Sequence, residues 1–244
     1  APGGTVVVPR GSWRTGGVLI PSDVTLRLDS GSILSFDSNP ERYLPVVPTR
    51  FEGMDVMNYM PLLYAPHAKN VAIIGYGKLM GNGEDWWGWR KTKNGIGELV
   101  SAKELYAMAK AGVPVEDRIF GDPQKLLRTS FLQFYESENV VVDGPTFVDG
   151  PMWTIHPVYS KNVTLRNVKV DTNGPNTDGV AIDSSENVTL ENSEIASGDD
   201  AIVVKSGLDD DGWRRNVPAK HVVIRDVEVT RGNGGVTIGS EMSG

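Results

Sequence analysis

Short segments that alternate apolar and polar residues recur along this chain. Each copy opens on a turn residue, usually Asn or Asp, and continues with branched apolar residues at every second position. A period of two predicts short β-strands with one buried face. The copies read "DVTLRL" at 23–28, "NVAIIG" at 70–75, "NVVVDG" at 139–144, "NVTLRN" at 162–167, "NVTLEN" at 187–192 and "HVVIRD" at 221–226.

The spacing of the copies predicts a solenoid. Those that start at 139, 162 and 187 are 23 and 25 residues apart, which fits one coil each. The step of 47 is interpreted as two coils, and the steps of 69 and 34 as coils with insertions. Because repeat units stack on their neighbours, we predict an all-β fold, a right-handed parallel β-helix. A β-sandwich, also built from short strands, is the alternative.

Residues 84–130 interrupt the pattern and predict a loop and helix insertion from one coil. Residues 101–111 have helical spacing, with Ser101 as the N-cap. The tryptophans at 86, 87 and 89 either pack this loop onto the solenoid or wall one end of a cleft. Residues 1–244 are expected to form one β-helix domain that lacks its N-terminal cap and its C-terminal coils.

Composition narrows the class of function. The 244 residues contain no cysteine and only three histidines, which are far apart, so a zinc site or another cofactor is not indicated. The net charge of −7 argues against a nucleic-acid partner, and no apolar run is long enough to span a membrane. Since the chain opens without an initiator Met, we expect upstream processing and a secreted or periplasmic location.

Three aspartates form the candidate catalytic centre. When Asp178 is aligned with Asp200, 22 residues later, the apolar residues that follow also align. Equivalent residues of stacked coils lie about 4.8 Å apart, so these two carboxylates should be neighbours, with Asp199 beside them. Mutual repulsion raises at least one pKa, which provides an acid and a base near neutral pH. The alternative for these aspartates is a solvated turn, or a role in capping backbone N–H groups.

Three motifs, taken in order, resemble glycoside hydrolase family 28, the polygalacturonase family of pectin-degrading enzymes. They are "NTDG" at 176–179, "SGDD" at 197–200 with "KSG" at 205–207, and "GNGG" at 232–235 with "IGS" at 238–240. The resemblance implies a right-handed β-helix that hydrolyses α-glycosidic bonds of galacturonan, or a related uronate polymer, with inversion. It also implies Asp199 as general acid, Asp178 and Asp200 as the groups that activate water, and Asn176 as a substrate contact.

Two features depart from the pattern of that family. Its third motif usually reads Gly-His-Gly, whereas this chain has Asn233 at the histidine position. Alignment of Val236 with Ile202 places this amide on the column of Asp199, where it can donate a hydrogen bond but cannot titrate. The Arg-x-Lys pair that the family uses to hold the substrate carboxylate does not occur in these 244 residues.

Further substrate contacts are predicted from stacking. Alignment of Trp153 with Val180 places His156, Asp183 and Lys205 in one column. His156 is either a structural histidine or a sugar contact, and Lys205 could neutralise Asp183 or meet a uronate carboxylate. We expect a local basic patch from two residues of the segment 207–219, Arg214 and Arg215.

The leading hypothesis is therefore a pectin hydrolase, with a pectic polysaccharide as its partner. The large insertion favours a cleft closed at one end and hence exo action. Alternatives are a rhamnogalacturonan-type hydrolase, a polysaccharide lyase, and a catalytically weakened β-helix that only binds carbohydrate. A lyase would need a calcium site and a basic proton abstractor rather than three carboxylates.

Overall fold

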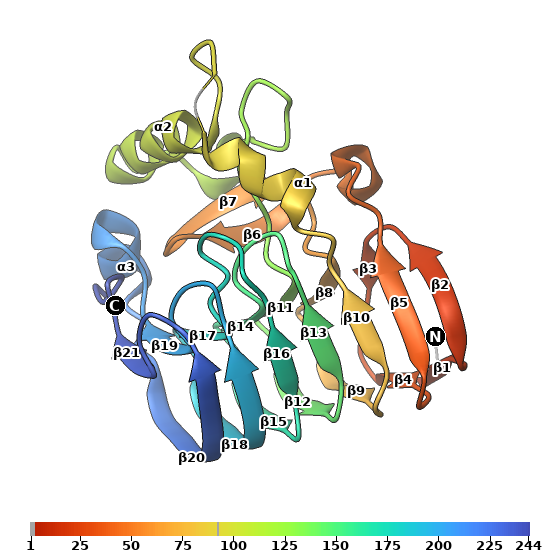
Figure 1. Ribbon diagram of the computed structural model, residues 1–244. Helices are drawn as coiled ribbons and strands as arrows, with labels where there is room; N and C mark the ends of the chain where they lie inside the picture. The colour runs from red at the N-terminus through yellow and green to blue at the C-terminus, as the bar shows by residue number, and fades with distance from the viewer. Residues whose placement is uncertain (1–2, 92) are drawn as a thin grey trace.

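The structure is a computed structural model that describes residues 3–91 and 93–244 (Figure 1). Its strands stack coil on coil along one axis and pair in parallel, except in one hairpin, and the two ends of the chain lie at opposite ends of the stack. Parallel crossover connections are right-handed. The predicted right-handed parallel β-helix is confirmed, and the sandwich alternative is wrong.

All six copies of the repeated phrase lie on the same face of the solenoid. The central positions of neighbouring copies are in register, so Leu26, Ile73, Val142, Leu165 and Leu190 form one buried column in the interior. The strands of this face are β1 (Gly4–Val8), β4 (Val24–Leu28), β9 (Lys69–Ile74), β12 (Glu138–Asp143), β15 (Lys161–Arg166) and the first parts of β18 (Glu186–Ala196) and β20 (Lys220–Arg231).

An amide ladder explains why the phrase opens on Asn or Asp. Asp23, Asn70, Asn139, Asn162 and Asn187 all have φ between 55° and 62°, a left-handed conformation that these residues tolerate best after glycine. Each Nδ2 donates to the side-chain oxygen one coil earlier, at 2.8, 3.1, 3.0 and 3.1 Å along the column. The repeated turn therefore also bonds one coil to the next.

Two further faces complete the coil. Their strands, like those of the first face, stack along the axis in chain order. The second face contains β2 (Gly11–Thr15), β5 (Ser32–Phe36), β10 (Lys78–Met80), β13 (Thr146–Val148), β16 (Lys169–Asp171) and the later parts of β18 and β20. The third face contains β3 (Val18–Leu19), β8 (Leu63–Pro66), β11 (Leu132–Tyr135), β14 (Ile155–Val158), β17 (Val180–Asp183), β19 (Ile202–Lys205) and β21 (Val236–Ile238).

The interpretation of the 47-residue step as two coils is wrong. Strand β4 pairs directly with β9, with Thr25 opposite Ala72, so this step is one coil. Its extra residues form η1 (Pro40–Tyr43) and an antiparallel hairpin of β6 (Val47–Phe51) and β7 (Met54–Asn58). The steps of 69 and 34 are single coils with insertions, because β9 pairs with β12 and β18 pairs with β20.

The predicted insertion lies between β10 and β11. It contains α1 (Glu84–Trp87), η2 (Gly88–Arg90), α2 (Glu98–Lys110) and η3 (Val115–Asp117), and a later insertion contains α3 (Asp209–Arg215). Helix α2 starts three residues before Ser101, the expected N-cap. Ser101 is instead a buried residue of the first turns of the helix. Its N-cap is Gly97, and the carboxylate of Glu98 in the first turn binds the buried Arg128. Within the described residues, no helix is long and apolar enough to cross a bilayer.

The hairpin and the insertion cover the outer side of the third face. Ala181 and Val203 alternate with core residues, so they point outward, and they are buried against Phe51 and Leu105. Figure 1 shows β6, β7 and α2 together above β14, β17 and β19. Trp86 is fully buried, with its ring centroid 5.4 Å from that of Tyr43. This placement favours the packing role over the cleft wall for Trp86.

Candidate functional site

The three aspartates lie in two stacked turns that lead into β17 and β19. Val180 pairs with Ile202 as predicted, and the N–H of Gly179 donates to the carbonyl of Asp200 at 3.0 Å. A Cβ on Gly179 would lie 2.5 Å from the carbonyl oxygen of Ala201. The glycine of the "NTDG" motif is therefore required by the close approach of the next coil.

One cavity of about 460 Å³ contains all three carboxylates. Stacking of the turns brings them together with Asn176 and Lys205, so five of the predicted site residues line one space. The full lining consists of Glu52, Trp153, Asn176, Asp178, Asp199, Asp200, Lys205, Thr237, Ile238, Gly239, Ser240 and Glu241.

Asp199 and Asp200 both face this cavity although they are adjacent in sequence. Residues 197–200 form an irregular turn rather than part of β19, so the alternation of a strand does not apply to them. The Ser197 hydroxyl donates to the carbonyl of Asp199 at 2.8 Å and holds the turn. The turn before β19 therefore allows both side chains to face the cavity.

Burial sets the charge state of Asp178. Its side chain is 4% exposed, and Oδ1 has no hydrogen-bond partner among the described residues. Burial, with the charge of Asp199 as the next contribution, raises its pKa to about 8, and Lys205 only partly opposes this. At neutral pH Asp178 therefore holds a proton, which fits neither a solvated turn nor a cap.

Each oxygen of Asp199 lies near one side-chain amide. Asn233 Nδ2 donates to Oδ1 at 3.0 Å, and Asn176 Nδ2 lies 3.4 Å from Oδ2. The predicted alignment of Val236 with Ile202 is observed, and the N–H of Asn233 donates to the carbonyl of Asp199 at 2.8 Å. The amide that replaces the expected histidine thus contacts the carboxylate itself.

Lys205 is the cation that lines the cavity. Its Nζ lies 2.5 Å from Glu241 Oε2 and 3.0 Å from the carbonyl of Gly239, and it is 4.8 Å above the ring of Trp153. The lysine therefore pairs with Glu241 and not with Asp183. A ligand carboxylate that binds Lys205 has to displace or share this contact.

His156 and Asp183 are buried on the outer side of the third face, beneath the hairpin, and do not line the cavity. The predicted register is wrong by two residues, because Val158, not His156, pairs with Asp183. Asp183 binds Arg50 through both oxygens, at 2.7 and 3.1 Å, and this guanidinium holds the pKa of Asp183 well below its usual value despite the burial. His156 Nδ1 lies 2.9 Å from Ser130 Oγ, and burial lowers its pKa. This arrangement favours the structural role for His156.

Replacement of Asp183 by Asn should destabilise the fold by about 3–5 kcal/mol, since it leaves the fully buried Arg50 without its full partner. The matched control is Asp143→Asn, which removes an exposed ion pair with Arg166 and should cost less than about 1 kcal/mol. Urea unfolding at pH 7 measures both. Equal effects would mean that the Arg50 pair does not hold the hairpin to the solenoid.

Arg214 and Arg215 do not form a basic patch beside the aspartates. They line a different cavity of about 220 Å³, together with Arg118 and residues of the insertion. Arg214 binds Asp211 at 2.6 Å, and Arg215 binds Asp55 at 2.8 Å. Helix α3 directs both guanidinium groups toward the hairpin and α2, so their main partners are carboxylates of the protein.

Sequence reasoning missed the residues that the insertions bring to the site. Glu52, at the turn of the β6–β7 hairpin, lines the cavity, and burial raises its pKa to about 7, with Glu98 as the next cause. Arg90 and Arg128 contact Asn176. The alternating residues around Glu52-Gly53 could have indicated a hairpin, but no pattern in the sequence indicates which side chains reach the aspartates.

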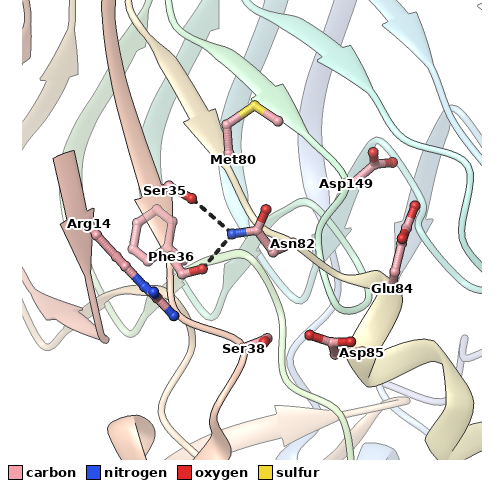
Figure 2. A pocket seen from close by; sticks show the side chains of 9 residues that line it. All are labelled: Arg14, Ser35, Phe36, Ser38, Met80, Asn82, Glu84, Asp85 and Asp149. Carbon is pink, nitrogen blue, oxygen red and sulfur yellow. Dashed lines mark hydrogen bonds between the residues drawn. The ribbon is translucent and has the colours of Figure 1, made fainter. Parts of the chain in front are cut away.

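A larger cavity lies elsewhere on the molecule (Figure 2). It measures about 590 Å³ and is lined near the start of α1 by Glu84, Asp85 and Asp149, with Asn82 bound to Ser35 at 2.9 Å. It contains none of the three stacked aspartates. Among the described residues, no group of three or more His, Asp or Glu side chains is placed to hold a metal ion. The pKa of Asp149 is also raised by burial, but the smaller cavity contains a buried carboxyl, Asp178, whose pKa is raised to about 8, so it is the better candidate site.

The fold and the site together define a parallel β-helix with a carboxylate cluster on its outer surface. Residues 122–244 match the family "Glycosyl hydrolases family 28", and the chain belongs to this family. It is 29% identical to a probable polygalacturonase of Vitis vinifera over 99% of this chain and 45% of that protein. It is also 25% identical to an exo-poly-alpha-D-galacturonosidase of Dickeya chrysanthemi, over 96% of this chain and 42% of that protein.

A solved structure shows the same arrangement of the backbone. The exopolygalacturonase from Thermotoga maritima, described as hyperthermoactive, superimposes with a TM-score of 0.94 at 43% sequence identity. The match covers 98% of this chain and 56% of that one. The chain thus spans about half the length of the relatives it matches.

Proposed function

We propose that this protein is an inverting glycoside hydrolase that cleaves α-glycosidic bonds in polygalacturonate or a related uronate polymer. The observation that carries the proposal is the grouping of Asp178, Asp199 and Asp200 in one cavity, with the proton on Asp178. Inversion needs one carboxylic acid for the leaving oxygen and one carboxylate to activate water. Family membership and the polygalacturonase relatives support a pectic substrate.

The likeness to the family suggests the roles of the three carboxylates. Asp199 donates a proton to the leaving oxygen, while Asp178 and Asp200 orient and deprotonate the water. In the unliganded site the proton is on Asp178, so this assignment requires the proton to lie on Asp199 when the substrate is bound. The alternative, in which Asp178 is itself the acid, is favoured by its raised pKa and is tested separately below.

The relatives and the shape of the site support exo action on the chain end. Both the Dickeya chrysanthemi and the Thermotoga maritima proteins are named as exo-acting. The β6–β7 hairpin places Glu52 in the lining of the cavity, where it would limit the space for further sugar units. Since a polymer of this kind does not cross a bilayer, the enzyme would act outside the cytoplasm, as a secreted or periplasmic protein.

A panel of pectic polymers tests the proposal on the full-length protein. We expect reducing ends to appear from polygalacturonate, with monomer or dimer as the first product and a β-anomer in the initial NMR spectrum. Faster release from a rhamnogalacturonan would instead assign the rhamnogalacturonan-type alternative. An unsaturated product that absorbs in the ultraviolet would instead show a lyase, and binding without turnover would show a carbohydrate-binding β-helix.

A further inference from the structure

In the insertion between β10 and β11, every N–H group of the Arg128 guanidinium donates a hydrogen bond. Arg128 is 0% exposed and lies just before β11. Nε and Nη2 bind Glu98 at 2.7 and 2.6 Å, Nη1 binds the carbonyls of Pro175 and Pro151 at 2.6 and 3.0 Å, and Nη2 also binds Asn176 Oδ1 at 2.9 Å. These five contacts match the five N–H groups that arginine carries.

The acceptors connect three parts of the molecule. Glu98 is in the first turn of α2, whereas Pro151 and Pro175 are in the turns before β14 and β17. Arg128 therefore joins the insertion to the turns of two successive coils, and the second of these turns carries Asp178 and stacks against the turn of Asp199 and Asp200. A lysine at this position could not form the same set of contacts, since it has one nitrogen and no planar fork.

The chemistry of arginine determines which way the Asn176 amide faces. Its Oδ1 accepts from Arg128 at 2.9 Å and from Arg90 at 2.5 Å. Arginine has donors only, so the amide must present its oxygen to the two guanidinium groups. Nδ2 is then turned toward Asp199 Oδ2, 3.4 Å away.

We propose that Arg128 is a positioning residue that acts through Asn176 to hold the carboxylate of Asp199 in the cavity. This inference rests on the proposed hydrolase function, because its main readout is catalysis. Asn233 holds the other oxygen of Asp199 at 3.0 Å, so the carboxylate is held between two amides. Asn176 is the amide that a buried charge orients. Of the two arginines that bind it, Arg128 is buried and Arg90 is partly exposed.

Arg128→Lys and a double-mutant cycle test the proposal in the full-length protein. We expect kcat on polygalacturonate to fall about 100-fold with little change in KM, because a small displacement of a catalytic group has an effect of this size. Asn176→Ala should lower kcat by a similar factor. In the Asn176→Ala background, Arg128→Lys should cause little further loss, since both changes remove the same contact.

Arg118→Lys is the matched control. Arg118 is also buried in this insertion, binds Asp211 through two nitrogens and donates to the carbonyls of Val113 and Asp55, but it does not contact the aspartate cavity. We expect a loss of stability like that of Arg128→Lys, with kcat unchanged within about two-fold. Equal kcat losses in the two lysine variants, or additive losses in the cycle, would overturn the positioning role.

Two observations keep the inference testable if another step fails. If Arg128→Lys does not fold, an unchanged kcat in Asn176→Ala alone would overturn the proposal. If the wild type hydrolyses no uronate polymer, the proposed function fails, and crystal structures of wild type and Arg128→Lys decide the inference. The Asn176 side chain should then have moved away from Asp199 in the variant, whereas an unmoved side chain would refute the role of Arg128.

Discussion

Asp199→Asn is expected to abolish hydrolysis of polygalacturonate, with a loss in kcat of about 100- to 10,000-fold. The amide has the shape of the carboxyl but cannot protonate the leaving oxygen. The side chain lies in a turn at the cavity rather than in the core, so folding should be retained. Release of reducing ends and a circular dichroism melt measure the two effects.

A change of leaving group separates the acid from the base. In an aryl α-galacturonide made from an acidic phenol, the phenolate can leave without being protonated. Loss of the general acid should therefore lower the rate much less on this substrate than on the polymer. If Asp199 is the acid, the Asp199→Asn variant should regain activity on the aryl substrate, whereas the Asp178→Asn variant should not. Recovery of Asp178→Asn instead would assign the acid to the carboxyl that holds the proton in the unliganded site.

Asp226→Asn is the control for this series. Asp226 is exposed on the solenoid surface with φ of 54°, a conformation that asparagine also tolerates, so both the fold and the activity should be unchanged. Activity of Asp199→Asn at the level of Asp226→Asn on the polymer would contradict the hydrolase assignment of this cavity.

Asp178→Asn is expected to stabilise the protein at neutral and alkaline pH while it destroys activity. The pKa of Asp178 is about 8 in the folded protein, whereas an unperturbed aspartate has a pKa of 3.8, so the folded state binds more protons than the unfolded state between these values. Wild-type stability therefore falls as pH rises from about 4 to about 8. Asparagine does not titrate, so the advantage of the variant grows over this range and is largest above about pH 8.

Urea unfolding at pH 4, 7 and 9 measures this advantage. At pH 9 we expect the variant to gain on the order of 2–5 kcal/mol, since each unit of pKa shift corresponds to about 1.4 kcal/mol and neighbouring charges reduce the total. At pH 4 the two proteins should be nearly equal. A variant that is less stable than wild type at pH 9 would show that the folded protein favours the ionised form of Asp178.

Repetition explains how much of this structure could be predicted from the sequence. The six copies of one phrase indicated the first face, and alignment by one coil placed Asp178 beside Asp200 and Asn233 beside Asp199. Two register predictions failed. The 47-residue step is one coil with an insertion. His156 is two residues away from the column assigned to it, although its coil has no insertion, because the alignment used Trp153 where Ile155 pairs with Val180.

The charges around the aspartates illustrate what pattern alone does not reveal. The sequence offered Arg214 and Arg215 as the basic patch because they are close to Asp199 along the chain. In the structure α3 turns them toward Asp55 and Asp211, and the guanidinium groups that contact Asn176 come from the insertion more than 45 residues upstream, at Arg90 and Arg128.

The order of residues along the chain was enough to predict the solenoid, the register of the coils that carry the aspartates, and the trio of carboxylates. These follow from backbone pairing between repeats, which copies one local pattern at a fixed period. Packing in three dimensions was needed to bring Glu52 and Arg128 to the site and to bury Asp183 away from it. Insertions have no period, and their positions depend on which apolar surfaces they cover, here the outer side of the third face around Ala181 and Val203.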